Sequence, residues 1–169
     1  MPNGVPAVAP PPSPQYTATE TYTDNILGPV HFTLNDLMVG GQTAPSHPPH
    51  PQNSPLVISR NEQFKICVTI TFHDSPLTRL LLCLKMRLTV IFALEGFGTA
   101  TETEVTVVES TEKDKLSYVV CYEGTPQGAG LTPGFYKIAS VVQVGPVDNE
   151  CSHEILGFGF ISEVLLQVY

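Results

Sequence analysis

The sequence contains no tryptophan and few basic residues, since its 169 residues include 8 Lys and Arg against 16 Asp and Glu, for a formal net charge of −8. No Lys or Arg precedes Arg60, so the earlier part of the chain carries only the charges of Glu20, Asp24 and Asp36. Nucleic acids and anionic membranes attract proteins through clustered cations. We therefore expect neither as a partner.

Long apolar runs are also absent. The stretch LLLCL at residues 80–84 is far shorter than the ~20 apolar residues that span a bilayer, so we expect no membrane insertion. The opening residues MPNGVPAVAPPPSP lack the basic and apolar regions of a secretory signal peptide. An export route therefore cannot be read from this segment.

Closely spaced cysteines are missing as well. The four cysteines are Cys67, Cys83, Cys121 and Cys151, without a CxxC motif. This spacing does not favour a zinc site. A chain of this length can form a core without disulfides, and strand alternation places Cys67 on the same polar face as Lys65 and Thr69. Free thiols are the favoured interpretation, and a disulfide framework is the alternative.

Apolar and polar residues alternate with a period of two along most of residues 56–169, which is typical of β-strands. The clearest strands are FKICVTITF at 64–72 and LKMRLTVIFALE at 84–95, the second with Leu84 and Phe92 facing inward. Further strands are predicted at 102–110, 115–122, 135–144 and 155–168. Only the stretch from Leu77 to Cys83 suits a short helix as well as a strand. Turn-forming clusters separate the strands, and about seven or eight of them at this spacing predict an all-β, antiparallel β-sandwich.

One motif refines the predicted fold. In GLTPGFYKIASVVQV, residues 130–144, a Pro133-Gly134 turn comes just before Tyr136. This resembles the tyrosine-corner entry to the penultimate strand of immunoglobulin-like domains, and the resemblance covers residues 56–169 at the level of strand order. It implies a buried Tyr136 ring whose hydroxyl bonds back to the chain. The alternative is an ordinary type II turn before a strand.

An unusual N-terminal part precedes this domain. We predict an extended arm over residues 1–41, a Pro/His-rich spacer over 42–55 and the β-sandwich over 56–169. Threonine alternates with other residues over 16–23, which favours a strand but offers little apolar area. Pro-rich spacers are stiff and extended, so such an arm could reach another molecule.

This order of segments resembles the donor-strand subunits of self-assembling, pilin-like fibrils, in which an extended segment pairs with an open sheet edge. The resemblance implies a structural protein that forms a homo-oligomer or helical filament by β-strand addition, outside the cell or on its surface. The assembly interface would comprise the alternating arm residues and one face of the next apolar strand: Tyr16, Thr17, Thr19, Thr21, Tyr22, Thr23, Val30, Phe32 and Leu34. The alternative is that residues 30–39 form the first strand of their own sandwich.

A second function remains open, an adhesion or carbohydrate-binding β-sandwich that uses the loops 124–130 and 145–150. The absence of tryptophan counts against a carbohydrate site. Enzymatic activity is not expected, nor are catalytic residues, cofactors or metals. The paired His47 and His50 read as part of the spacer, residues 148–150 as a turn, and Glu102 with Glu104 as a solvated strand edge.

Overall fold

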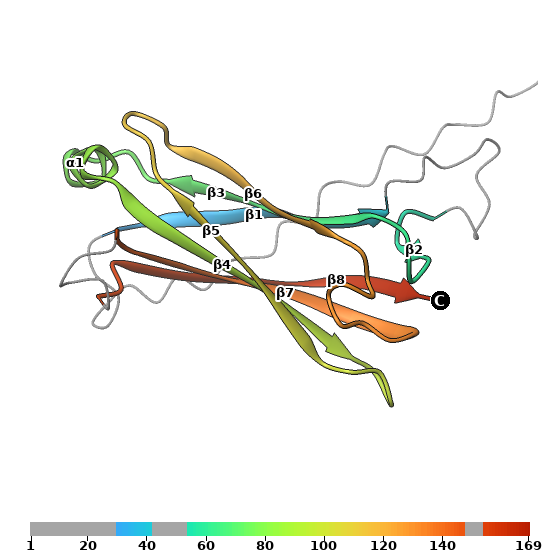
Figure 1. The fold of residues 1–169 in the computed structure, drawn as a ribbon. Coiled ribbons are helices and arrows are strands. Elements are labelled where there is room, and N and C mark those ends of the chain that lie inside the picture. Colours follow the sequence, from blue (N-terminus) through green and yellow to red (C-terminus); the bar gives the residue numbers. More distant parts are fainter. Residues whose placement is uncertain (1–29, 42–53, 148–153) are drawn as a thin grey trace, which may run out of the picture.

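The computed structural model describes residues 30–41, 54–147 and 154–169 of the chain (Figure 1). It is all-β apart from one short helix, as the alternation predicts. The elements in chain order are β1 (Phe32–Gly41), β2 (Val57–Ile58), β3 (Phe64–Phe72), α1 (Pro76–Leu84), β4 (Met86–Gly96), β5 (Thr103–Ser110), β6 (Ser117–Gly124), β7 (Gly134–Pro146) and β8 (Gly157–Val168).

The strands form two sheets that pack face to face as a β-sandwich (Figure 1). One sheet has the order β1-β3-β6 and the other the order β2-β8-β7-β4-β5. All pairings are antiparallel except that of β2 with β8, which is parallel. The chain passes from one sheet to the other five times: between β1 and β2, between β2 and β3, between β3 and β4 through α1, between β5 and β6, and between β6 and β7. Because α1 leads from one sheet to the other, it lies at one end of the sandwich, beside the start of β1.

The inner faces of the two sheets make the core. In β3 and β4 every second side chain is buried, so the inward phase predicted for both strands is confirmed. Phe92 in the middle of β4 is fully buried, and Thr89 lies on the outer face. Leu84 is an exception to the predicted phase, because it belongs to α1 and its side chain is 67% exposed.

Local chemistry explains why the ambiguous stretch forms a helix. Ser75 is its N-cap, and its hydroxyl accepts a hydrogen bond from the Thr78 N–H at 3.1 Å. Pro76 occupies the first turn, where a missing N–H costs nothing. The helix ends at Leu84, and its C-cap Lys85 adopts a φ of 66° and so turns the chain into β4.

Tyr136 makes the expected hydrogen bonds back to the chain. Its ring is fully buried, and its hydroxyl donates to the Thr132 carbonyl at 2.6 Å and accepts from the Thr132 N–H at 3.0 Å. A similar arrangement, which the sequence reading missed, holds the β5–β6 connection. There the Tyr118 hydroxyl donates to the Glu112 carbonyl at 3.2 Å and accepts from the Glu112 N–H at 2.8 Å.

The preference for free thiols was wrong for two of the four cysteines. Cys67 of β3 and Cys121 of β6 lie directly opposite each other in register, with their Cα atoms 4.2 Å apart, and form a disulfide. Both side chains lie on the outer face of the three-stranded sheet, so the predicted face of Cys67 was right. Cys83, on α1, is free and exposed.

Candidate functional site

Strand β1 is the part of the described chain that contains predicted interface residues. It lies at the edge of the three-stranded sheet, and among the described strands it pairs with β3 alone, from Phe32 opposite Phe72 to Gly41 opposite Phe64. Val30, Phe32 and Leu34 are each no more than 2% exposed and belong to the core of the sandwich. The structure therefore brings these three side chains together on one face, within the sandwich of their own chain.

The seat of β1 is shaped by two glycines of the opposite sheet. Gly157 and Gly159 of β8 face the Phe32 ring, and a Cβ atom added at Gly159 would lie 2.6 Å from Phe32 Cε2. Real Cβ atoms do not approach that closely, so any larger residue would displace the ring. The GFGF sequence of β8 thus provides a close fit for β1. The sequence reading did not use this signal.

The other end of β1 is also anchored. The Gly41 N–H donates to the Pro55 carbonyl at 3.0 Å, so the chain returns to the end of β1 after residues 42–53. Within β1, the pairing shifts between Asn35 and Met38, and Asp36 adopts a φ of 52°. Such a β-bulge twists an edge strand and discourages unwanted pairing along it.

The remaining predicted interface residues, Tyr16, Thr17, Thr19, Thr21, Tyr22 and Thr23, lie outside the described residues.

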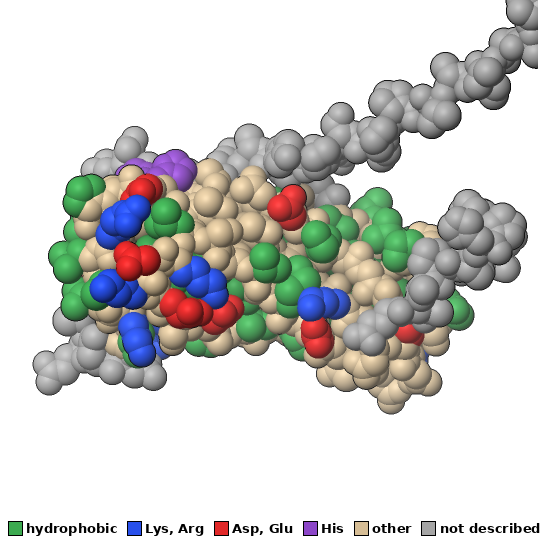
Figure 2. Space-filling model, turned by 90° about the horizontal axis from the view of Figure 1, so that it is seen from above, with side chains coloured by type: hydrophobic (Ala, Val, Ile, Leu, Met, Phe, Trp, Pro, Cys, Tyr) green, Lys and Arg blue, Asp and Glu red, His purple; other side chains and the backbone are tan. Residues whose placement is uncertain are grey.

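Both outer faces of the sandwich carry little charge. On the face that Figure 2 shows, charged side chains gather mainly towards the α1 end. The Lys65–Glu123 salt bridge joins the start of β3 to the end of β6, which is the other end of these strands. Val119 of β6 is 63% exposed.

The outer face of the five-stranded sheet has a comparable uncharged band. Two neighbouring rows of side chains cross four strands without a charged residue, namely Phe160–Val141–Ile91–Thr106 and Phe158–Gln143–Thr89–Val108. Phe160 and Val108 are among the exposed large hydrophobic residues. The band ends at Arg87 on one side and at Ala93 and Glu104 on the other.

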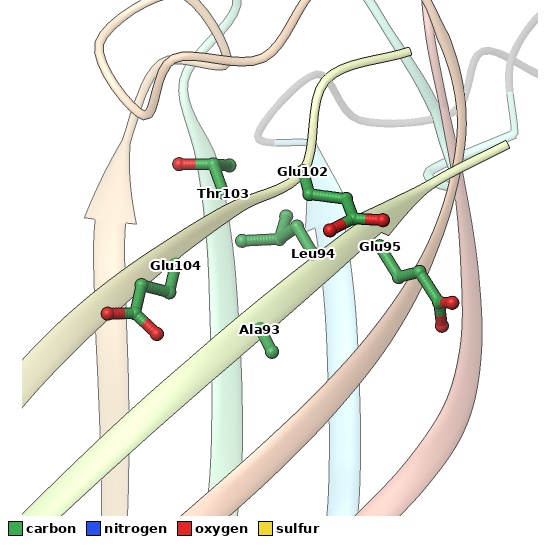
Figure 3. A pocket seen from close by; sticks show the side chains of 6 residues that line it. All are labelled: Ala93, Leu94, Glu95, Glu102, Thr103 and Glu104. Carbon is green, nitrogen blue, oxygen red and sulfur yellow. The ribbon is translucent and has the colours of Figure 1, made fainter. Parts of the chain in front are cut away.

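Away from α1, a shallow depression lies over the ends of β4 and β5 (Figure 3). It is lined by Glu95, Glu102 and Glu104 together with Ala93, Leu94 and Thr103. Glu102 and Glu104 lie at the edge of the sheet, as predicted, because β5 is an edge strand. In the described parts of the chain, no three His, Cys, Asp or Glu side chains lie close enough to hold a metal ion.

Electrostatic shifts in the molecule have structural causes. Arg79 donates two hydrogen bonds to the Asp74 carboxylate, at 2.6 and 2.7 Å, and lowers the pKa of that carboxyl. Both groups are exposed, so this pair contributes little to stability. Burial raises the pKa of the Tyr118 hydroxyl, which is hydrogen-bonded to Glu112 in the β5–β6 connection.

The loops of the second candidate function differ in their packing. The loop after β6 is packed onto the domain, since the Thr103 hydroxyl donates to the Ala129 carbonyl at 3.0 Å and Leu131 is buried. The loop 145–150 is described only as far as Val147.

No helix in the described residues is long and apolar enough to cross a membrane. Comparison of the chain with models of known protein families and with curated protein sequences finds no match.

Proposed function

We propose that this protein is a structural subunit that forms a homopolymer by donating its arm, including β1, to the sandwich of a neighbouring copy. The observation that carries this proposal is the packing of β1: this edge strand, together with Val30 just before it, places Val30, Phe32 and Leu34 in a slot shaped by Gly157 and Gly159. A β1 from a second copy would make the same contacts. The slot therefore suits β-strand addition, in which main-chain bonds provide affinity and side-chain pockets provide register.

The connection after β1 supports such an exchange. Residues 42–53, with the proline-rich sequence QTAPSHPPHPQN, connect Gly41 at the end of β1 to the next described part of the chain, which begins at Ser54. Extended at about 3 Å per residue, this spacer spans roughly 35 Å, which is comparable to the length of the longer strands. That reach is enough to place β1 in an adjacent molecule. Each copy would then donate one arm and accept one, a head-to-tail contact that forms filaments when it does not close into a ring.

Two further features support the finer parts of the proposal. The strand order β1-β3-β6 facing β2-β8-β7-β4-β5, together with the hydrogen-bonded tyrosine near the start of the penultimate strand, supports an immunoglobulin-like sandwich. The Cys67–Cys121 disulfide supports an oxidising location outside the cell or on its surface. The disulfide of antibody domains joins the two sheets, whereas this one joins two strands of the same sheet.

The experiment is sedimentation velocity and negative-stain electron microscopy of the full-length protein over a concentration series. We expect species larger than one chain, and filaments at high concentration. The truncated domain is a poor test, because removal of β1 would uncover Phe72, whose ring lies 5.8 Å from that of Phe32. A protein that sediments as a single chain at every concentration would contradict the proposal.

A carbohydrate-binding or adhesion module is the second candidate, favoured by one observation. Phe97 and Phe135 are 55% and 57% exposed, and the Phe97 N–H donates to the Phe135 carbonyl at 2.9 Å, so the two lie on adjacent strand ends. Glu95 of the acidic depression is two residues from Phe97. Exposed aromatic rings beside carboxylates suit a sugar ligand. Affinity electrophoresis with soluble polysaccharides, comparing wild type with Phe97→Ala and with Val108→Ala as a control, tests this candidate.

A further inference from the structure

An apolar groove lies between α1 and the end of β7, at the end of the sandwich where β1 begins. Its volume is about 190 Å³. This is less than the roughly 300–1,000 Å³ of small-molecule pockets, and suits one or two side chains of a peptide segment. The groove is lined by Leu81, Leu84, Lys85, Met86, Pro146, Val147 and Leu156.

The helix beside the groove presents its apolar side outward. Leu77, Leu80 and Leu84 are 42%, 54% and 67% exposed, at the i, i+3, i+7 spacing that places them along one side of a helix. The helix is held to the sandwich mainly through Thr78 and Leu82, its only buried residues. A row of exposed leucines next to an apolar groove indicates a surface that another segment covers.

The path of the chain indicates which segment that is. The Val30 N–H donates to the carbonyl of Leu156, a residue of the groove, at 3.2 Å, and His31 accepts from the His73 N–H at 2.9 Å. Residues that precede Val30 therefore start at the rim of the groove. Leu27 is three residues before Val30, which limits its distance to about 10 Å for an extended chain.

The composition of residues 1–29 fits this position. Ile26 and Leu27 are a pair of large aliphatic residues just before β1, whereas residues 9–25 contain no Ile, Leu, Val, Met or Phe. The segment carries Glu20 and Asp24 and no Lys or Arg, and Lys85 lines the groove. Its apolar side chains match the groove, and its charge is opposite to that of the cation there.

We propose that the groove beside α1 binds Ile26 and Leu27 of whichever chain supplies the β1 seated in that sandwich. In the assembly described above this is the neighbouring copy, and that part of the inference rests on the proposed function. Binding in the groove would extend the docked arm beyond β1 and bury the exposed side of α1. The arm would then be held at both ends, by the groove before β1 and by the Gly41–Pro55 contact after it.

Disulfide trapping in the full-length protein tests this inference. In a Cys83→Ser, Cys151→Ser background, Ile26→Cys is combined with Leu84→Cys in the groove, or with Val119→Cys on the outer face of β6 as the control. Both acceptor positions are exposed to a similar degree, 67% and 63%. Under mild oxidation we expect the pair with Leu84→Cys to cross-link at least tenfold faster than the control.

The size of the product separates the two proposals. Cross-linked dimers or ladders on a denaturing gel support both the groove and the exchange of arms. A fast cross-link within one chain, in a protein that sediments as a monomer, supports the groove and overturns the proposed assembly. Equal cross-linking rates of Ile26→Cys with Leu84→Cys and with Val119→Cys would contradict binding of Ile26 in the groove, whatever the sedimentation result. A third variant replaces Ile26→Cys by Asn149→Cys, and faster cross-linking of Asn149→Cys than of Ile26→Cys to Leu84→Cys would contradict it as well.

Discussion

Two buried tyrosines each fix the segment that leads into their own strand, because the hydroxyl bonds both the N–H and the carbonyl of one residue in that segment. Tyr136 does so with Thr132 and Tyr118 with Glu112. A hydroxyl that both donates and accepts closes the connection more firmly than a single bond. At the first site, removal of the hydroxyl would leave the N–H and the carbonyl of Thr132 without that partner.

We therefore expect Tyr136→Phe to lower the free energy of unfolding by about 1 to 2 kcal/mol, because two hydrogen bonds are lost and nothing replaces them. The measurement is the urea midpoint followed by circular dichroism. Tyr169→Phe is the matched control, since Tyr169 is 62% exposed and should tolerate the change. An unchanged midpoint for Tyr136→Phe would mean that its hydroxyl does not hold the turn.

The Cys67–Cys121 disulfide joins residues that are 54 positions apart. A cross-link over a loop of this length restricts the unfolded chain, and we expect its removal to cost about 2 to 4 kcal/mol. The measurement is the urea midpoint of the wild type with and without dithiothreitol. The Cys67→Ala, Cys121→Ala double variant should match the reduced wild type and should not respond to the reductant. A wild-type midpoint that is insensitive to the reductant would contradict the disulfide.

At the scale of elements, the phase of β4 determines which face of the sheet meets the core. We expect Phe92→Ala to cost about 3 to 5 kcal/mol, because it empties a fully buried site, and Thr89→Ala on the outer face to cost less than about 1 kcal/mol. Denaturant titration of both variants measures the difference. Equal costs would show that the inward face has been assigned to the wrong residues.

The alternation that predicts β3 and β4 is a local property, and the sequence therefore located these strands well. It could not decide α1, because LTRLLLC fits both a period of two and a period of 3.6. The decision depends on the cap at Ser75, on the φ of Lys85 and on the need to cross between sheets. The pairing of Cys67 with Cys121 could not be predicted from a local pattern either. Strand phase gives the face of each cysteine, but only the adjacency of β3 and β6 brings them together.

The candidate site was predictable to a similar extent. Strand phase placed Val30, Phe32 and Leu34 on one face, and these side chains do share a buried face. The surface they pack against depends on Gly157 and Gly159, more than a hundred residues later in the chain. The exposed leucines of α1 were missed for a related reason. Their exposure follows from how α1 sits on the sandwich, which no local pattern determines.

At the scale of the whole molecule, donor and acceptor parts can be damaged separately. Phe32→Asp places a charge on the buried face of β1, which damages the arm and leaves the slot intact. Gly159→Leu fills the space of the Phe32 ring, which damages the slot and leaves the arm intact. If arms are exchanged between copies, each variant alone lacks one half of every interface.

We therefore expect neither variant to form polymers alone, whereas a mixture of the two should form one-to-one dimers. In such a dimer the arm of the Gly159→Leu chain occupies the slot of the Phe32→Asp chain, and the damaged arm and slot remain at the two ends. Because each end is closed to further addition, the mixture should stop at two chains. The measurement is sedimentation velocity of each variant and of the mixture, with one chain carrying a fluorescent label.

The double variant Phe32→Asp, Gly159→Leu is the control. It has neither an intact arm nor an intact slot, so it should form no dimer with either single variant. A mixed dimer distinguishes exchange of arms from association of copies through the outer faces of the sheets. Those faces are the same in all variants, so face-to-face association would occur in each variant alone. Loss of polymers in both variants without a mixed dimer would show that β1 stays in the sandwich of its own chain and that its damage acts only on stability.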